Sequence, residues 1–234
     1  GSKDNPQIFF GENLKAQFYM EEQKQDSAYY YSKIAFYNLP NNMPHYNVYM
    51  NSLVYKKDIE EINKVFDYVR SLSGDTKVIW SIYLTALART TTLGDPFSMS
   101  IADEGFALYP EDDQIFGLYR MMTYGQKRLI QASELSQKGM ELYEKSNFDA
   151  AYELLNQAFD LDPLEYTYAI QTAFSLYENS KYEQAIPYFK IALNSKRREP
   201  KEKAMRYLAL SLYKMELEKE ACVAFSKLIN TYPK

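Results

Sequence analysis

The chain has 234 residues, a hydrophobic content of 46% and a formal net charge of −4, with few glycines and prolines. This composition is ample for a folded core and argues against disorder. Acidic and basic residues are mixed along the chain, which argues against a nucleic-acid-binding protein, because such proteins normally carry a basic face. No apolar run approaches the roughly 20 residues needed to span a bilayer, so we expect no direct membrane insertion of this chain.

Side chains that carry catalysis or bind metals are scarce. The single cysteine, Cys222, excludes an internal disulfide and a cysteine-based zinc cage, and we expect a small buried thiol at this position. The single histidine, His45, lies in a segment predicted to join two helices, where we expect it to be solvated. A histidine-rich metal site, an HExxH motif and a glycine-rich phosphate loop are all absent from the sequence. We therefore predict a non-enzymatic protein with no cofactor and no metal site.

The first 110 residues are predicted to form three degenerate helical hairpins, over 9–42, 43–76 and 77–110. In the first of them, small residues recur at fixed offsets, namely Ala16, Ala28 and Ala35. Larger residues replace the small ones in the second hairpin. The turn of the third, Thr90 to Pro96, is longer by about two residues. These copies are recognised mainly because they stay in phase with clearer copies further along the chain.

The 34-residue spacing is interrupted between residues 111 and 131. We interpret this segment as an irregular helical connector. There is room for one odd helix near 112–124, and the pair Asp112-Asp113 favours a helix N-terminus through the helix dipole. We place the boundary between two segments of the array near Gly125.

Three clear repeats follow, over 132–165, 166–199 and 202–234. In the first, Ala151 and Ala158 lie on one helix face, and the helix stops before Pro163, because proline cannot continue a helix. The matching positions of the next repeat lie 34 residues further along, and a two-residue slip precedes the last repeat. The recurring small residues predict pairs of helices that approach closely, stacked unit upon unit as a solenoid.

One repeat carries a specific motif, formed by Gly139, Leu142, Tyr143, Phe148, Asp149, Ala150, Ala151, Ala158, Phe159, Leu161, Asp162 and Pro163. It resembles the tetratricopeptide (TPR) repeat. The resemblance implies an all-α fold: a right-handed superhelix of about six helical hairpins plus the odd helix. It also implies a concave groove, lined by the first helix of each pair, that receives a peptide or protein segment.

Periodicity then selects candidate groove residues on the first helices of the three clear repeats. They are Ser136, Met140, Tyr143, Ile170, Phe174, Tyr177, Arg206, Leu210 and Tyr213. Tyr143, Tyr177 and Tyr213 are equivalent and should align as a ladder, either as a ligand surface or as packing between helices. With Lys203 alone of the right kind, a clamp for a C-terminal carboxylate is not expected. Alanine at Phe174 and Tyr177 is predicted to weaken partner capture without loss of helicity.

A second resemblance rests on the segments Asp26–Tyr30, Ala35–Asn42 and Tyr55–Asp58. These are similar to extracytoplasmic TPR regions of Bacteroidetes-type bacteria, some of which are appended to membrane proteins of the O-antigen ligase and polymerase class. The resemblance implies, as an alternative function, a periplasmic accessory domain of a larger glycan-assembly protein. It favours a periplasmic or cell-envelope location over the cytoplasm. Gly1-Ser2 is typical of an expression scar, so the removal of a leader or membrane tether is compatible with this sequence.

Overall fold

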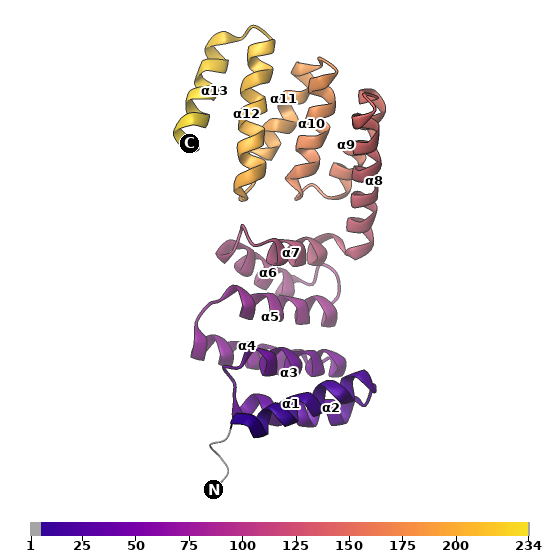
Figure 1. Cartoon of the computed structure of the whole chain (residues 1–234), viewed down its shortest axis with the longest axis vertical. Helices are drawn as coiled ribbons and strands as arrows, with labels where there is room; N and C mark the ends of the chain where they lie inside the picture. Colours follow the sequence, from indigo (N-terminus) through magenta and orange to yellow (C-terminus); the bar gives the residue numbers. More distant parts are fainter. Residues whose placement is uncertain (1–5, 234) are drawn as a thin grey trace. The chain divides into compact units, whose positions relative to one another are not determined.

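The computed structural model describes residues 6–233, which contain thirteen α-helices and no strand (Figure 1). The first helices in chain order are α1 (Pro6–Glu21), α2 (Gln25–Asn38), α3 (Met43–Lys56), α4 (Ile59–Ser73), α5 (Lys77–Thr90), α6 (Pro96–Leu108) and α7 (Asp113–Tyr124). They are followed by α8 (Gln126–Glu144), α9 (Phe148–Leu161), α10 (Tyr166–Glu178), α11 (Tyr182–Ala192), α12 (Arg198–Lys214) and α13 (Glu218–Thr231). The prediction of an all-α array of about six helical hairpins is confirmed, and α7 is the predicted odd helix.

The chain forms two compact units, the first ending at Thr123 and the second beginning at Tyr124. Within unit 1, α3 packs against α1, α2, α4 and α5, and α5 packs against α6. Within unit 2, α10 packs against its hairpin partner α11, against α9 and against the first helices α8 and α12 of the neighbouring hairpins. Within each unit, neighbouring hairpins therefore bury their apolar stripes on one another, as in a solenoid.

Every hairpin turn contains one residue with a positive φ angle. These residues are Gln23, Lys57, Gly94, Ser146, Ser180 and Glu216. Their φ values lie between 54° and 74°, in the left-handed region where a helix commonly ends. Glycine occupies this position only in the α5–α6 turn, which is the longer turn predicted from the sequence and spans Thr91–Asp95.

Several helices of unit 1 begin at a short polar side chain that accepts a backbone hydrogen bond. Asn42, Asp58 and Asp95 accept from the amides of His45, Glu61 and Ser98. The predicted helix start at Asp112 is confirmed, because its carboxylate accepts from the amides of Gln114 and Ile115 at 3.1 and 3.0 Å. These bonds satisfy donors that the helix itself leaves unpaired.

The large side chains of the core are concentrated in unit 1. Unit 1 has one continuous core of large residues, which includes Phe36, Tyr46, Tyr49, Trp80 and Tyr83. The contacts between the helices of unit 2 include nine fully buried alanines beside a few larger residues such as Leu155 and Phe189. Those alanines are Ala132, Ala151, Ala158, Ala169, Ala173, Ala185, Ala192, Ala204 and Ala209.

Two expectations for single residues are wrong. His45 is fully buried rather than solvated, because α3 already begins at Met43 and the imidazole lies in the first turn of this helix. The centre of its ring is 5.6 Å from that of Phe10. Cys222 is exposed rather than buried. The preceding residue, Ala221, takes the buried position on α13, and a step of one residue turns the side chain about 100° around the helix.

Candidate functional site

The first helices of the three hairpins in unit 2, α8, α10 and α12, lie side by side, because α10 packs against both of the others. A polar contact joins two of them: the Ser136 hydroxyl on α8 donates to Oε1 of Gln171 on α10 at 2.8 Å. Residues at the same position of successive repeats therefore form rows across these helices. We call the surface formed by the nine predicted residues on these helices the first-helix face.

The nine predicted residues differ widely in exposure. Ser136 and Ile170 are buried, with 6% and 3% of their surface exposed. Tyr213 is 59% exposed, and Arg206 is also exposed. The remaining five are partly buried, namely Met140, Tyr143, Phe174, Tyr177 and Leu210. A ligand on this face would therefore contact mainly the row that begins with Met140 and the row that begins with Tyr143. In the row that begins with Ser136, only Arg206 is exposed enough to be contacted.

The predicted tyrosine ladder consists of two partly buried rings and one exposed ring. Burial raises the pKa of the Tyr143 and Tyr177 phenols, and the nearby Glu178 carboxylate raises both further. One carboxylate thus acts on phenols from two adjacent helices, α8 and α10. Tyr213 on α12 continues the row, and its ring is exposed.

A fourth tyrosine, Tyr207 on α12, completes this cluster. Its ring lies 4.4 Å from that of Phe174 and 5.5 Å from that of Tyr177, and it stacks on the buried Phe189 at 5.9 Å. The sequence reasoning missed Tyr207, because Gln171 takes the same position in the preceding repeat and the row shows no aromatic pattern. Its position beside a row of predicted groove residues was the available signal.

These ring contacts give Phe174 and Tyr177 a packing role as well as an exposed edge. Phe174 contacts both Phe189 and Tyr207, and the Tyr177 ring also meets that of Tyr182 at 5.2 Å. Alanine at either position would therefore remove contacts between α10, α11 and α12. Tyr213 and Met140 are better positions at which to probe ligand contact separately from stability.

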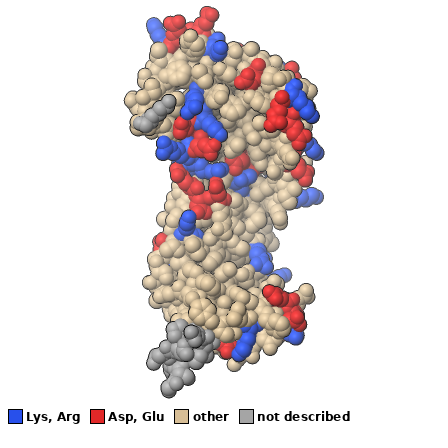
Figure 2. All heavy atoms as spheres, in the orientation of Figure 1, with Lys and Arg blue, Asp and Glu red and all other residues tan. Residues whose placement is uncertain are grey.

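Charge on the first-helix face is limited to the neighbourhood of Arg206. The Arg206 guanidinium is held by Glu202 one turn earlier at 3.0 Å, while Lys214 makes no ion pair among residues 6–233. On the face of the molecule in Figure 2, charged side chains gather over unit 2, and much of unit 1 in view is uncharged.

The described residues also lack the features of a metal site and of a membrane span. No three His, Cys, Asp or Glu side chains within residues 6–233 are arranged to hold a metal ion. In the same range, no helix combines the length and the apolar character needed to cross a membrane.

Comparison with known proteins gives structural similarity only. The chain is similar to the TPR2AB domain of yeast Sti1 in complex with pHSP90, with a TM-score of 0.41 and 16% identity over 97% of this chain and 91% of that one. It is also similar to PilF of Pseudomonas aeruginosa, with a TM-score of 0.37 and 12% identity over 100% and 95% of the two chains. A MamA structure (MSR-1) gives a TM-score of 0.37 and 16% identity over 79% and 95%.

All three scores are below 0.5, so the description of the fold rests on the helices of this chain themselves. No protein-family model matches the chain, and no curated protein does.

Proposed function

We propose that this chain is a non-catalytic binding protein that takes up a peptide or protein segment on the first-helix face of unit 2. The observation that carries the proposal is Tyr213, a large apolar ring that is 59% exposed at the end of a row of partly buried tyrosines. Aromatic rings presented on a packed scaffold are the side chains that most often dominate protein interfaces.

Binding on this face would bury apolar surface without a large rearrangement of the helices. Met140, Phe174 and Leu210 form one row and the tyrosines form the other, and both rows are held by the packing of α8, α10 and α12. Because the helices that carry these side chains are already packed together, little backbone conformational entropy would be lost when a ligand is bound. An apolar or aromatic segment fits these rows, and Arg206 and Lys214 favour an acidic residue near its α12 end.

The test is a Tyr213→Ala variant, in which the exposed ring is removed and no ring contact seen in the structure is lost. The chain is immobilised, proteins retained from a lysate of the source organism are identified by mass spectrometry, and the affinity of the principal partner is then measured with purified protein. We expect a loss of about tenfold or more, as for other aromatic interface residues.

The matched control is Ile229→Ala on α13, where an equally exposed apolar residue lies away from the first-helix face. Its affinity should equal that of the wild type. If the Tyr213→Ala variant has unchanged far-UV circular dichroism and still retains the partner fully, this face is not the binding surface.

The alternative function, an accessory domain of a larger membrane glycan-assembly protein, draws on a different surface. Unit 1 exposes four tyrosine rings that could stack on sugars, at Tyr30, Tyr37, Tyr55 and Tyr68. An immunoblot of fractionated source cells separates the two functions: a membrane-bound band much larger than this chain favours the accessory domain, whereas a soluble band near 27.4 kDa contradicts it.

A further inference from the structure

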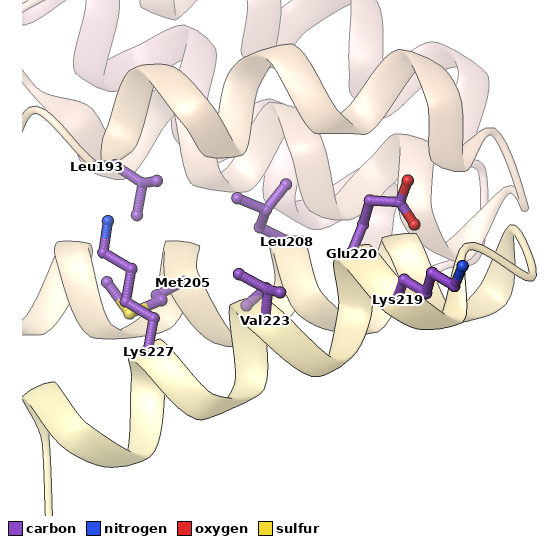
Figure 3. Close-up of a pocket in the computed structure, with 8 residues that line it drawn as sticks. Leu193, Met205, Leu208, Lys219, Glu220, Val223 and Lys227 are labelled. Atoms are coloured by element: carbon purple, nitrogen blue, oxygen red, sulfur yellow. The ribbon is translucent and has the colours of Figure 1, made fainter.

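A second surface of unit 2 has an apolar hollow that none of the predicted site residues line. It is lined by α12, α13 and the residue that follows α11, and it has a volume of about 440 Å³. We call it the α11–α13 hollow. Its lining residues are Leu193, Met205, Leu208, Lys219, Glu220, Val223, Ala224 and Lys227 (Figure 3). The volume lies within the range of about 300–1,000 Å³ that is typical of ligand pockets.

This hollow is on the opposite side of α12 from the first-helix face. Leu208 lies two residues from both Arg206 and Leu210, and two residues turn a helix by about 200°. A ligand in the hollow would therefore not overlap a ligand on the first-helix face.

The equivalent space one repeat earlier, between α9 and α11, is filled by a tyrosine of the chain itself. The Tyr188 hydroxyl on α11 donates to Oδ1 of Asn156 at 2.7 Å and lies 3.4 Å from the Tyr152 hydroxyl. Its ring also meets that of Phe159 at 6.1 Å. An aromatic side chain thus closes the gap between the second helices of these two hairpins.

The repeat register shows why the next gap is open. The buried alanine of α11, Ala185, corresponds to Ala221 of α13, which is also buried. The same offset places Ala224 where Tyr188 stands in the preceding repeat. A methyl group therefore replaces a phenol, and Val223 beside it remains 70% exposed.

The two ends of the hollow differ in charge. Lys227 lies at one end beside Leu193 and Met205, whereas Lys219 and Glu220 lie together at the other (Figure 3). Within the described part of the chain, Lys227 makes no ion pair, and no carboxylate lines its end of the hollow. A ligand with an aromatic ring and a neighbouring carboxylate would place the ring against the apolar lining and pair the carboxylate with the Lys227 ammonium.

We propose that the α11–α13 hollow binds an aromatic side chain of a partner peptide, with an acidic neighbour of that residue directed at Lys227. The ring occupies the space that Tyr188 occupies in the preceding repeat, against Leu208 and Val223. The ligand class is thus a linear segment in which a tyrosine or phenylalanine is flanked by aspartate or glutamate.

The experiment uses the whole chain and a short fluorescein-labelled peptide, Gly-Ser-Asp-Tyr-Asp-Ser-Gly, with binding followed by fluorescence anisotropy. The decisive variant is Ala224→Tyr, which should fill the hollow from within, as Tyr188 does one repeat earlier. Its control is Ser226→Tyr, which adds the same ring to an exposed position about 200° around α13. Lys227→Glu tests the charged end.

We expect the peptide to bind wild type and Ser226→Tyr equally, and to bind Ala224→Tyr at least about tenfold more weakly, as on loss of an aromatic anchor. Lys227→Glu should weaken binding by about twofold to fivefold, the range for an exposed ion pair. A peptide with alanine in place of tyrosine should not bind.

Three results would overturn the proposal. The first is a wild-type chain that does not bind the peptide. The second is undiminished binding to Ala224→Tyr, provided that this variant keeps the melting temperature of the wild type. The third is concentration-dependent self-association of the wild type that Ala224→Tyr abolishes, because a second copy of the chain would then be the occupant.

Discussion

The two units use the same pairing of helices but fill the space between them in different ways. In unit 2, α8, α9, α10 and α11 approach closely because alanines such as Ala158 and Ala173 lie at the contacts. In unit 1, α1 and α2 also carry buried alanines, Ala16, Ala28 and Ala35. From α3 to α5, however, the corresponding space is filled by Tyr46, Tyr49 and Trp80, which are fully buried in one continuous core.

This difference shows that small residues are one way to build a helical hairpin array and are not a requirement of it. Interior packing density must be similar in both units, and either small side chains at a short distance or large ones at a longer distance can achieve it. The repeat signature of small residues is therefore easy to see in unit 2 and weak in α3–α6 of unit 1, although both units form hairpins.

The largest expected effect is the loss of a large core residue from unit 1. Trp80 is fully buried, its Nε1 donates to Oδ1 of Asp75 at 2.8 Å, and its ring lies 5.0 Å from that of Phe66. We expect Trp80→Ala to lower the free energy of unfolding of unit 1 by about 3–5 kcal/mol. Hydrogen exchange measured helix by helix should show increased exchange throughout α3–α6.

The control for that change is Phe97→Ala, which removes a ring that is 48% exposed on α6. It should alter the free energy of unfolding by no more than about 0.5 kcal/mol. Equal destabilisation by both variants would contradict the view that unit 1 depends on its aromatic core.

The corresponding test of unit 2 is to enlarge a residue at a close contact. A Cβ atom at Gly139 would lie 2.7 Å from Cγ of Leu155 and 3.3 Å from its backbone nitrogen. Leu155 is fully buried and cannot move away freely. We expect Gly139→Ala to destabilise unit 2 by about 1–3 kcal/mol in urea denaturation, in spite of the better helix propensity of alanine.

Gly117 on α7 provides the contrast, because a Cβ atom there meets nothing within 4 Å. Gly117→Ala should stabilise the chain by about 0.5–1 kcal/mol, since alanine reduces the conformational freedom of the unfolded state. If Gly139→Ala were stabilising to the same extent, close approach of α8 and α9 would not be what requires glycine.

The smallest expected effect is a pH dependence confined to unit 1. Burial of the His45 imidazole lowers its pKa below the ordinary value of about 6.5, and the backbone of Ala35 opposes this shift only in part. The unfolded chain therefore binds a proton at a higher pH than the folded chain. Stability should be complete above about pH 6.5 and should fall as the pH decreases below it, by at most about 1.4 kcal/mol per pH unit.

Urea denaturation between about pH 6.5 and 5.5 measures this effect, because most carboxyl groups titrate below that range. A His45→Leu variant, which fills the same space with a side chain that does not titrate, should have a stability that does not change with pH in this range. The same slope in wild type and variant would mean that His45 is not the group responsible.

Part of the candidate site could be predicted from the sequence and part could not. Spacing alone placed Tyr143, Tyr177 and Tyr213 at equivalent positions on three first helices. It did not predict that Ile170 would be buried with Ala169, Ala192 and Ala204, because exposure depends on how closely the neighbouring hairpin approaches. Tyr207 was missed because its row shows no aromatic pattern, and its contacts with Phe174 and Phe189 depend on how the consecutive helices α10, α11 and α12 pack together.

The sequence by itself determined the helical hairpins, their number and the odd helix, because helix periodicity, proline stops and the spacing of small residues are local properties of the chain. Only the tertiary structure decided that His45 is buried, that Cys222 is exposed and that a hollow opens beside Ala224. These outcomes depend on which side chain from another helix reaches the same space, and no pattern along a single helix contains that information.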